Sequence, residues 1–150
     1  MKNLFSVEGK VALVTGGSRG IGEMIARGFV ENGAKTYIAS RKREVCEAVA
    51  QELSAYGTCI PLAADLGTNE GVRTLAAQLM EREPKLDVLV NNAGANWGAP
   101  IDEYPEDGWD KVLNLNLRSI FFLTQKLLPA LRAAATHASP ARVILSLIHI

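Results

Sequence analysis

The sequence has no net charge, because its 16 basic and 16 acidic side chains cancel over 150 residues. Without an overall field, no general attraction to nucleic acid or to anionic lipid is expected. The sequence also has no stretch approaching the roughly 18 apolar residues of a membrane span, and its start, MKNLFSVEGK, lacks the apolar core of a signal peptide. We therefore predict a cytoplasmic protein with neither a nucleic-acid nor a membrane partner.

The sequence has two cysteines. Cys46 and Cys59 are too far apart in the sequence for a CxxC pair, and neither has a histidine at the spacing of a zinc site. We predict two reduced, unreactive thiols and no metal site.

The sequence does contain apolar runs of strand length that alternate with segments of helical periodicity. This order is typical of a parallel sheet wrapped by helices. We predict an α/β fold, a Rossmann-like doubly wound parallel sheet truncated after about the fifth strand, in which residues 1–150 form the N-terminal part of a single domain. The expected strands cover residues 10–15, 35–40, 58–65, 86–94 and 141–147, the fourth running into a loop, and a long helix is expected over about 107–135.

The spacing of apolar residues also predicts the buried face of each shorter helix. Pro61 places the third strand near an edge of the sheet, and Thr68 is expected to cap the third helix. The expected faces are Ile21, Met24, Ile25, Gly28 and Phe29 in the first helix, Val45, Ala48, Val49, Glu52, Leu53 and Tyr56 in the second, and Val72, Leu75, Ala76, Leu79 and Met80 in the third.

A glycine-rich turn, TGGSRGIG, follows the first predicted strand at residues 15–22. A turn from strand to helix presents free backbone N–H groups and the positive end of the helix dipole, which together attract phosphate. Side chains there would hold a ligand away, and Gly16, Gly20 and Gly22 remove them. The spacing is G-x-x-x-G-x-G and predicts a dinucleotide pyrophosphate site. The alternative is an ordinary glycine turn.

A phosphate loop of the Walker type is disfavoured at the same glycines. Gly17 and Gly22 have the right separation, but Glu23 and Met24 stand where lysine and serine or threonine are required. ATP or GTP binding is therefore not expected.

The end of the second strand predicts the choice of dinucleotide. Folds selective for NAD usually place an acidic residue there, about 20 residues past the glycines. This chain has Ser40 and Arg41 instead, and a guanidinium suits a 2′-phosphate. Arg19 can approach the same phosphate from the glycine turn. We predict NADP(H) as the cofactor; the alternative is that residues 41–43 are simply a solvated helix start.

Four motifs in order, TGGSRGIG, AADL, NNAG and LNLN, resemble the short-chain dehydrogenase/reductase superfamily over Gly9 to Ile144. The phrases LSAYG, NNAGANWGA and YPEDGWDKV are most similar to the 3-oxoacyl reductases, in particular the branch linked to rhamnolipid synthesis. The resemblance implies an NAD(P)-binding domain and an NADP(H)-dependent oxidoreductase of lipid metabolism that transfers hydride to a ketone such as a 3-oxoacyl thioester. It also implies a small carbonyl or alcohol substrate and a full-length homodimer or homotetramer.

The resemblance assigns roles to individual residues. Asn116 would hold a water and the catalytic lysine in a proton relay; the alternative is a structural asparagine satisfied by nearby backbone. Its spacing places it in the buried stripe of the long helix if Val112, Ile120 and Leu123 form that stripe, and a buried amide needs hydrogen-bond partners. The implied cofactor contacts are Gly16, Ser18, Arg19, Gly20, Ile21 and Gly22 at the phosphates, Arg41 at the 2′-phosphate, Asp65 and Leu66 at the adenine, and Asn92, Ala93 and Gly94 along the ribose.

The remaining catalytic residues of the family have no counterpart here. Tyr37, Tyr56 and Tyr104 are followed four residues later by Arg41, Ile60 and Gly108, so no Tyr-x-x-x-Lys occurs. The catalytic serine is expected at about position 148, which is isoleucine, and Ser146 comes two positions early. We therefore expect the chain as given to be inactive. The alternative function is a non-catalytic nucleotide-binding or interaction module; a SAM-dependent methyltransferase ranks third, because its glycine loop and acidic ribose ligand differ.

The last six residues, LSLIHI, equal one reading frame of a common transposase-end sequencing adapter. We hypothesise that the native sequence ends at Ile144 and that residues 145–150 are a non-native tail. The alternative is a genuine apolar strand end, which the same residues would fit. In either case the fifth strand is expected to be an open, apolar sheet edge.

Overall fold

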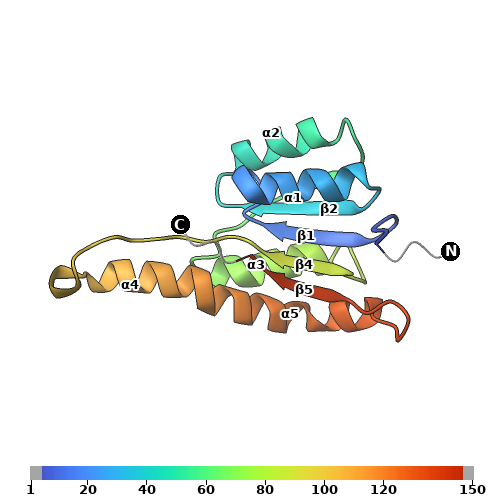
Figure 1. The fold of residues 1–150 in the computed structure, drawn as a ribbon. Helices are drawn as coiled ribbons and strands as arrows, with labels where there is room; N and C mark the ends of the chain where they lie inside the picture. The colour runs from blue at the N-terminus through green and yellow to red at the C-terminus, as the bar shows by residue number, and fades with distance from the viewer. Residues whose placement is uncertain (1–4, 147–150) are drawn as a thin grey trace.

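The computed structural model describes residues 5–146, which form a parallel five-stranded sheet covered by helices (Figure 1). The strand order is β3-β2-β1-β4-β5, and every neighbouring pair is parallel. The elements are β1 (Val11–Thr15), α1 (Gly20–Glu31), β2 (Lys35–Ser40), α2 (Arg43–Leu53), β3 (Cys59–Ala63), α3 (Asn69–Met80), β4 (Val88–Asn91), the 3-10 turn η1 (Ile101–Glu103), α4 (Glu106–Leu113), the π turn η2 (Asn114–Arg118), α5 (Ser119–Ala134) and β5 (Arg142–Leu145).

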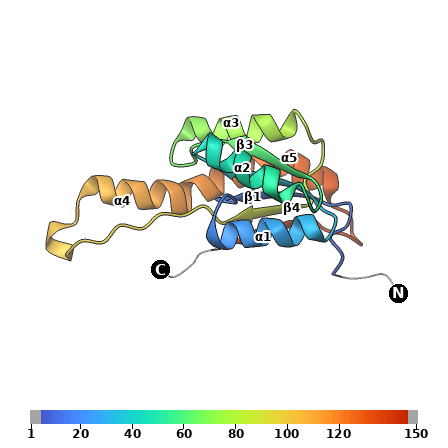
Figure 2. The same ribbon diagram turned by 90° about the horizontal axis from the view of Figure 1, so that it is seen from above.

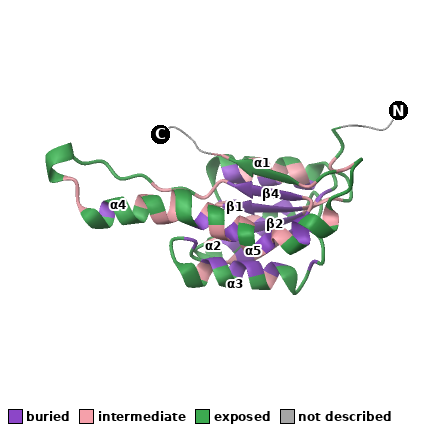
Figure 3. Cartoon of the chain, turned by 90° about the horizontal axis from the view of Figure 1, so that it is seen from below, coloured by how far each residue is buried: buried purple, intermediate pink, exposed green. Residues whose placement is uncertain are grey.

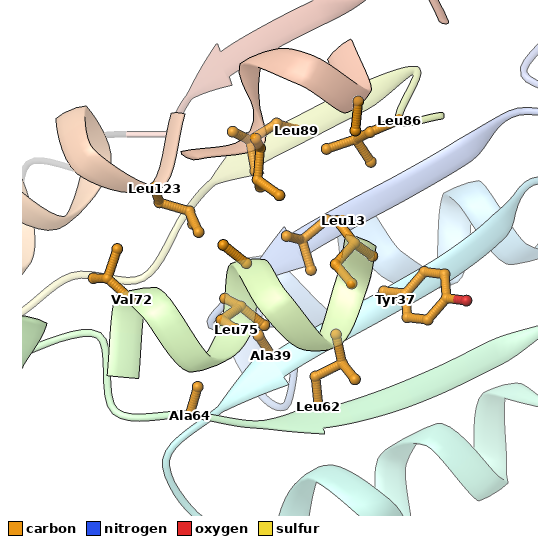
Figure 4. Close-up of a cluster of buried hydrophobic side chains, with 14 of the residues drawn as sticks. Leu13, Tyr37, Ala39, Leu62, Ala64, Val72, Leu75, Leu86, Leu89 and Leu123 are labelled. Atoms are coloured by element: carbon orange, nitrogen blue, oxygen red, sulfur yellow. The ribbon is translucent and has the colours of Figure 1, made fainter. Parts of the chain in front are cut away.

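Helices pack on both faces of the sheet, which confirms the predicted doubly wound α/β fold (Figure 2). One face carries α3 and α5, and its core includes Leu13, Leu75, Leu89 and Leu123, each with no exposed surface (Figure 4). The other face carries α1 and α2. The strands are apolar on both sides because both faces are covered, as the continuous apolar runs in the sequence predicted.

The predicted buried face of α1 is wrong in part. Its buried residues are Gly22, Ala26 and Val30, whereas Met24 is 63% exposed and Ile21 is 42% exposed. Gly22 and Ala26 face the sheet because their small size lets the helix backbone approach it closely. Gly28, also predicted in the buried face, is exposed, and Ile25 and Phe29 are partly buried against the core. Figure 3 shows this division along α1.

The predicted face of α2 is also wrong in part. Its buried residues are Cys46, Ala50 and Leu53, whereas four predicted residues are exposed, namely Val45, Ala48, Glu52 and Tyr56. In α3 the predicted face is confirmed at Val72, Leu75, Ala76 and Leu79, and Met80 is exposed. The predicted cap is also confirmed, since the hydroxyl of Thr68 accepts a hydrogen bond of 3.0 Å from the Gly71 N–H.

The two edges of the sheet differ. β3 is an edge strand, as Pro61 predicted. β5 forms the opposite edge, and its apolar residues Val143, Ile144 and Leu145 are each about half exposed, which confirms the expected apolar edge. β5 ends at Leu145, so Ser146, which was predicted in the strand, is not part of it; the predicted strand residue 147 lies outside the described part of the chain, as do residues 148–150.

The predicted long helix is present as a continuous series of α4, η2 and α5 over Glu106–Ala134. The π turn in its middle has no signal in the residue pattern. α4 and the segment before it project beyond the sheet, as both ribbon views show (Figures 1 and 2). Within residues 5–146, no helix is long and apolar enough to cross a membrane.

Candidate nucleotide-binding site

The glycine turn joins the carboxyl end of β1 to the start of α1 and is fixed by its neighbours. The Gly16 N–H donates to the Ala39 carbonyl at 2.8 Å, which ties the turn to the end of β2. A Cβ atom added at Gly22 would lie 2.5 Å from Asn92 Nδ2 and closer still to the Gly16 carbonyl oxygen. Two of the three glycines expected to admit a ligand are therefore required by the packing of the protein itself, because Gly16 also lies against Ala93.

Gly20 is different, because it faces open space. It has φ +54°, a left-handed conformation that favours glycine, and a Cβ added there would meet nothing within 4 Å. It is the first residue of α1, and Arg19 at the N-cap makes no side-chain capping hydrogen bond within the described residues. The positive end of this helix is thus free to receive an anion, with room for the anion beside Gly20.

A threonine and an asparagine hold the ends of β1 and β4 together beside the turn. The Thr15 hydroxyl donates to the Val90 carbonyl at 3.3 Å and accepts from the N–H groups of Asn92 and Ala93, each at 3.0 Å. The Asn92 amide donates to the Thr15 carbonyl at 3.1 Å and lies 3.4 Å from that of Gly16. The Asn92 side chain is thus directed at the glycine turn, and its Oδ1 also accepts from the Ser146 hydroxyl at 3.2 Å.

Two arginines lie at the same edge of the site. Arg19 is in the glycine turn and Arg41 directly follows β2, whose Ala39 carbonyl holds that turn. Both are exposed, and within the described residues neither forms an ion pair with a carboxylate. Two guanidinium groups without a carboxylate partner make this edge attractive to a phosphate.

The residues expected at an adenine lie at the carboxyl end of β3. Asp65 is exposed, and its carboxylate accepts a hydrogen bond of 3.0 Å from the Gly67 N–H. Leu66 is buried and belongs to the core on the α3 side. It also lines a small pocket of about 10 Å³ with Asn114, Arg118 and Phe122.

Asn116 lies on the π turn, half-buried, and both ends of its side-chain amide are used. Its Oδ1 accepts from the Ala95 N–H and its Nδ2 donates to the Ala95 carbonyl, each at 2.8 Å. The alternative of an asparagine satisfied by backbone therefore describes this side chain. A π turn often marks a functional position in a helix, because it changes the hydrogen bonding of the local carbonyl groups.

The structure brings the glycine turn, the Asn92–Gly94 segment, the two arginines and Asp65 to the carboxyl ends of adjacent strands, where α/β sheets bind ligands. Sequence reasoning missed two participants, Thr15 and Ala95, because a strand-end threonine and a loop alanine carry no recognisable signal. No group of three or more metal-ligating side chains occurs among residues 5–146. Burial raises the pKa of both thiols, that of Cys59 to about 12.

Comparison with known proteins decides the family. The model of the short chain dehydrogenases matches residues 10–144. This chain belongs to the short-chain dehydrogenase family. It is 52% identical over 144 residues to the rhamnolipids biosynthesis 3-oxoacyl-[acyl-carrier-protein] reductase of Pseudomonas aeruginosa, covering 96% of this chain and 56% of that protein. It is 42% identical to an L-fucose dehydrogenase of Bos taurus, covering 83% and 45%.

Solved structures of short-chain dehydrogenases have the same fold. The Pseudomonas aeruginosa RhlG/NADP active-site complex matches with a TM-score of 0.92 and 52% identity, covering 97% of this chain and 57% of that one. A metagenomic short-chain oxidoreductase in complex with NADP matches with a TM-score of 0.84 and 34% identity, covering 93% and 62%. The chain spans about half the length of the curated relatives it matches.

Proposed function

We propose that this chain binds NADP(H) at the carboxyl edge of the sheet, as the cofactor-binding part of a short-chain dehydrogenase that reduces a ketone such as a 3-oxoacyl thioester. The observation that carries the proposal is the open space at Gly20, beside the N-terminus of α1 and two arginines that form no ion pair among residues 5–146. The pyrophosphate would lie against the backbone N–H groups at this helix end. Ser18 and Ile21 flank the same turn.

The 2′-phosphate of the adenosine would lie between Arg19 and Arg41. A carboxylate at the end of β2 would favour a free 2′-hydroxyl, and that strand ends at Ser40 instead. The adenine would lie over Asp65 and Leu66, and the ribose of the nicotinamide half would lie along Ala93 and Gly94. The titles of two structural relatives, which name complexes with NADP, support this choice of cofactor.

The bound nicotinamide would supply the hydride in such a reduction. In this chain, Asn116 would be the relay residue of the family, and its side chain holds the Ala95 backbone, where the nicotinamide end of the cofactor would lie. The sequence has no Tyr-x-x-x-Lys motif. The chain as given therefore binds the cofactor without turnover, which makes a non-catalytic nucleotide-binding module the alternative for this polypeptide.

The setting of the whole enzyme is part of the proposal. It would act on a small carbonyl or alcohol substrate in the cytoplasm, as a homodimer or homotetramer. An exposed apolar row on the long helix, Trp109, Leu113, Leu117 and Phe121, supports an assembly through that helix, because soluble monomers rarely expose such rows.

Titration calorimetry with NADP⁺ and NAD⁺ tests the proposal. We expect NADP⁺ to bind the chain more tightly, and Gly20→Ala to weaken it about tenfold or more, because the new methyl group fills the space of the phosphate. Gly9→Ala is the matched control, since Gly9 also has a positive φ of 72° and open space around it, far from the site. Equal effects of the two substitutions on NADP⁺ affinity would refute the site.

The arginines allow a second comparison. Arg41→Ala is expected to weaken NADP⁺ about tenfold to a hundredfold and NAD⁺ by less than about twofold, because it removes a charged partner of the 2′-phosphate alone. Arg43→Ala is the control; Arg43 is exposed and its guanidinium lies 3.6 Å from Glu47 on the same helix. Equal losses for both dinucleotides would contradict the assignment of Arg41.

A further inference from the structure

The segment that follows β4 has no regular secondary structure over residues 92–100. Its path therefore depends on a few side-chain anchors. Asn92 fastens its start to the glycine turn, and Asn116 fastens Ala95 to the π turn through two hydrogen bonds of 2.8 Å. A third anchor lies further along the segment, at Trp97, a residue to which the sequence alone assigned no role.

The indole ring of Trp97 rests on α4 at Gly108. A Cβ atom added at Gly108 would lie 2.8 Å from three atoms of the ring, closer than any side chain can approach. The Lys111 ammonium lies 4.9 Å from the centre of the same ring, and the Tyr104 hydroxyl donates to the Trp97 carbonyl at 3.3 Å. Contacts from α4 thus hold the ring, and the Tyr104 hydroxyl holds the Trp97 backbone.

Glycine inside a helix needs a reason, because it is about 1 kcal/mol less favourable than alanine there. Gly108 is the third residue of α4, within its first turn, and is buried. The reason here is the tryptophan, since any larger residue would displace the ring. Displacing the ring would move the segment that carries Ala95, and Ala95 is where both ends of the Asn116 amide are bound.

We propose that Gly108 and Trp97 form a seat that positions the Ala95–Asn116 junction. Both are positioning residues, because neither lies at the glycine turn or the arginines. The inference deepens the proposed function and rests on it, because that function makes the Ala95–Asn116 junction the nicotinamide end of the site. A seat of this kind leaves the adenosine end of the nucleotide untouched.

Hydrogen exchange measured by NMR on this chain tests the seat directly. In Gly108→Ala we expect the Ala95 amide to exchange about tenfold faster and the Asn116 side-chain NH₂ signals to shift, with the amides of β1 unchanged. In a Trp97→Ala background, Gly108→Ala is expected to add nothing further, because there is no ring to displace. Gly28→Ala is the control, since Gly28 is a helical glycine with nothing within 4 Å of an added Cβ.

Trp97→Ala alone carries the test should Gly108→Ala fail to fold, because removing the ring introduces no clash. It is expected to accelerate exchange at Ala95 in the same selective way. Unchanged exchange at Ala95 in both variants, or equal acceleration in β1, would overturn the proposal.

Nucleotide binding separates the seat from the proposed function. Gly108→Ala is expected to weaken NADP⁺ about fivefold and to leave adenosine 2′,5′-bisphosphate, which occupies only the adenosine end, within about twofold. Equal weakening of the two ligands would overturn the assignment of the seat to the nicotinamide end. Failure of the unmodified chain to bind either ligand would refute the proposed function, while the exchange at Ala95 still decides whether the seat exists.

Discussion

Gly22→Ala is the substitution whose consequence the structure defines best. The added Cβ would lie 2.5 Å from Asn92 Nδ2 and still closer to the Gly16 carbonyl oxygen, about 1 Å inside ordinary contact distances. The carbonyl belongs to the backbone and cannot rotate away. The first turn of α1 would have to move from the sheet, and the Asn92 hydrogen bonds to the turn would lengthen.

The magnitude follows from two opposing effects. Overpacking a fixed site costs about 1–3 kcal/mol or more, and replacing glycine by alanine in a helix gains up to about 1 kcal/mol. We expect a net loss of about 2 kcal/mol in the free energy of unfolding for Gly22→Ala. For a chain of this size that corresponds to a Tm about 6 °C lower.

Urea unfolding followed by circular dichroism measures this difference. Gly28→Ala provides the reference, because Gly28 is exposed on the same helix and an added Cβ there meets nothing within 4 Å. It should be as stable as the unmodified chain or slightly more so. Finding Gly22→Ala as stable as Gly28→Ala would refute the reasoning that Gly22 is required by packing.

Two further predictions concern the thiols and the sheet edge. Burial, with a smaller effect of Cys46, raises the pKa of Cys59 from 9.0 to about 12. The contribution of this thiol to the free energy of unfolding should be fully present below pH 9 and should be lost as pH rises toward 12, because the unfolded chain ionises first. Urea unfolding at several pH values should show a shallower fall in stability for Cys59→Ala. Size-exclusion chromatography should show self-association through β5, reduced by Ile144→Lys; a monodisperse monomer would contradict this.

The order of strands and helices was predictable because hydrophobic periodicity and the residues that begin or end an element are local properties of the sequence. Thr68 and Pro61 are examples, since a cap and an edge proline act within a few residues of themselves. The face of α1 was not predictable from hydrophobicity, because close approach to the sheet selects Gly22 and Ala26 by size. Met24 is more apolar than either and lies in solvent.

Some residues of the candidate site were likewise predictable from the sequence, and others were not. The glycine turn, Arg19 and Arg41 could be found because their residue types are tied to the chemistry of phosphate. The π turn under Asn116 and the contact of Trp97 with Gly108 could not, because each depends on how segments far apart in the sequence meet. Asn116 itself was found through resemblance, and its partner, the Ala95 backbone, only through the structure.

The Thr15 hydroxyl joins the two halves of the sheet where the strand order reverses, between β1 and β4. Helices leave these two strands toward opposite faces, and open α/β sheets bind ligands at such a switch point. Three hydrogen bonds to the Thr15 hydroxyl hold the ends of β1 and β4 at a fixed separation. A ligand that binds there would meet strand ends that are already ordered. The entropic cost of ordering them is met during folding instead of on binding.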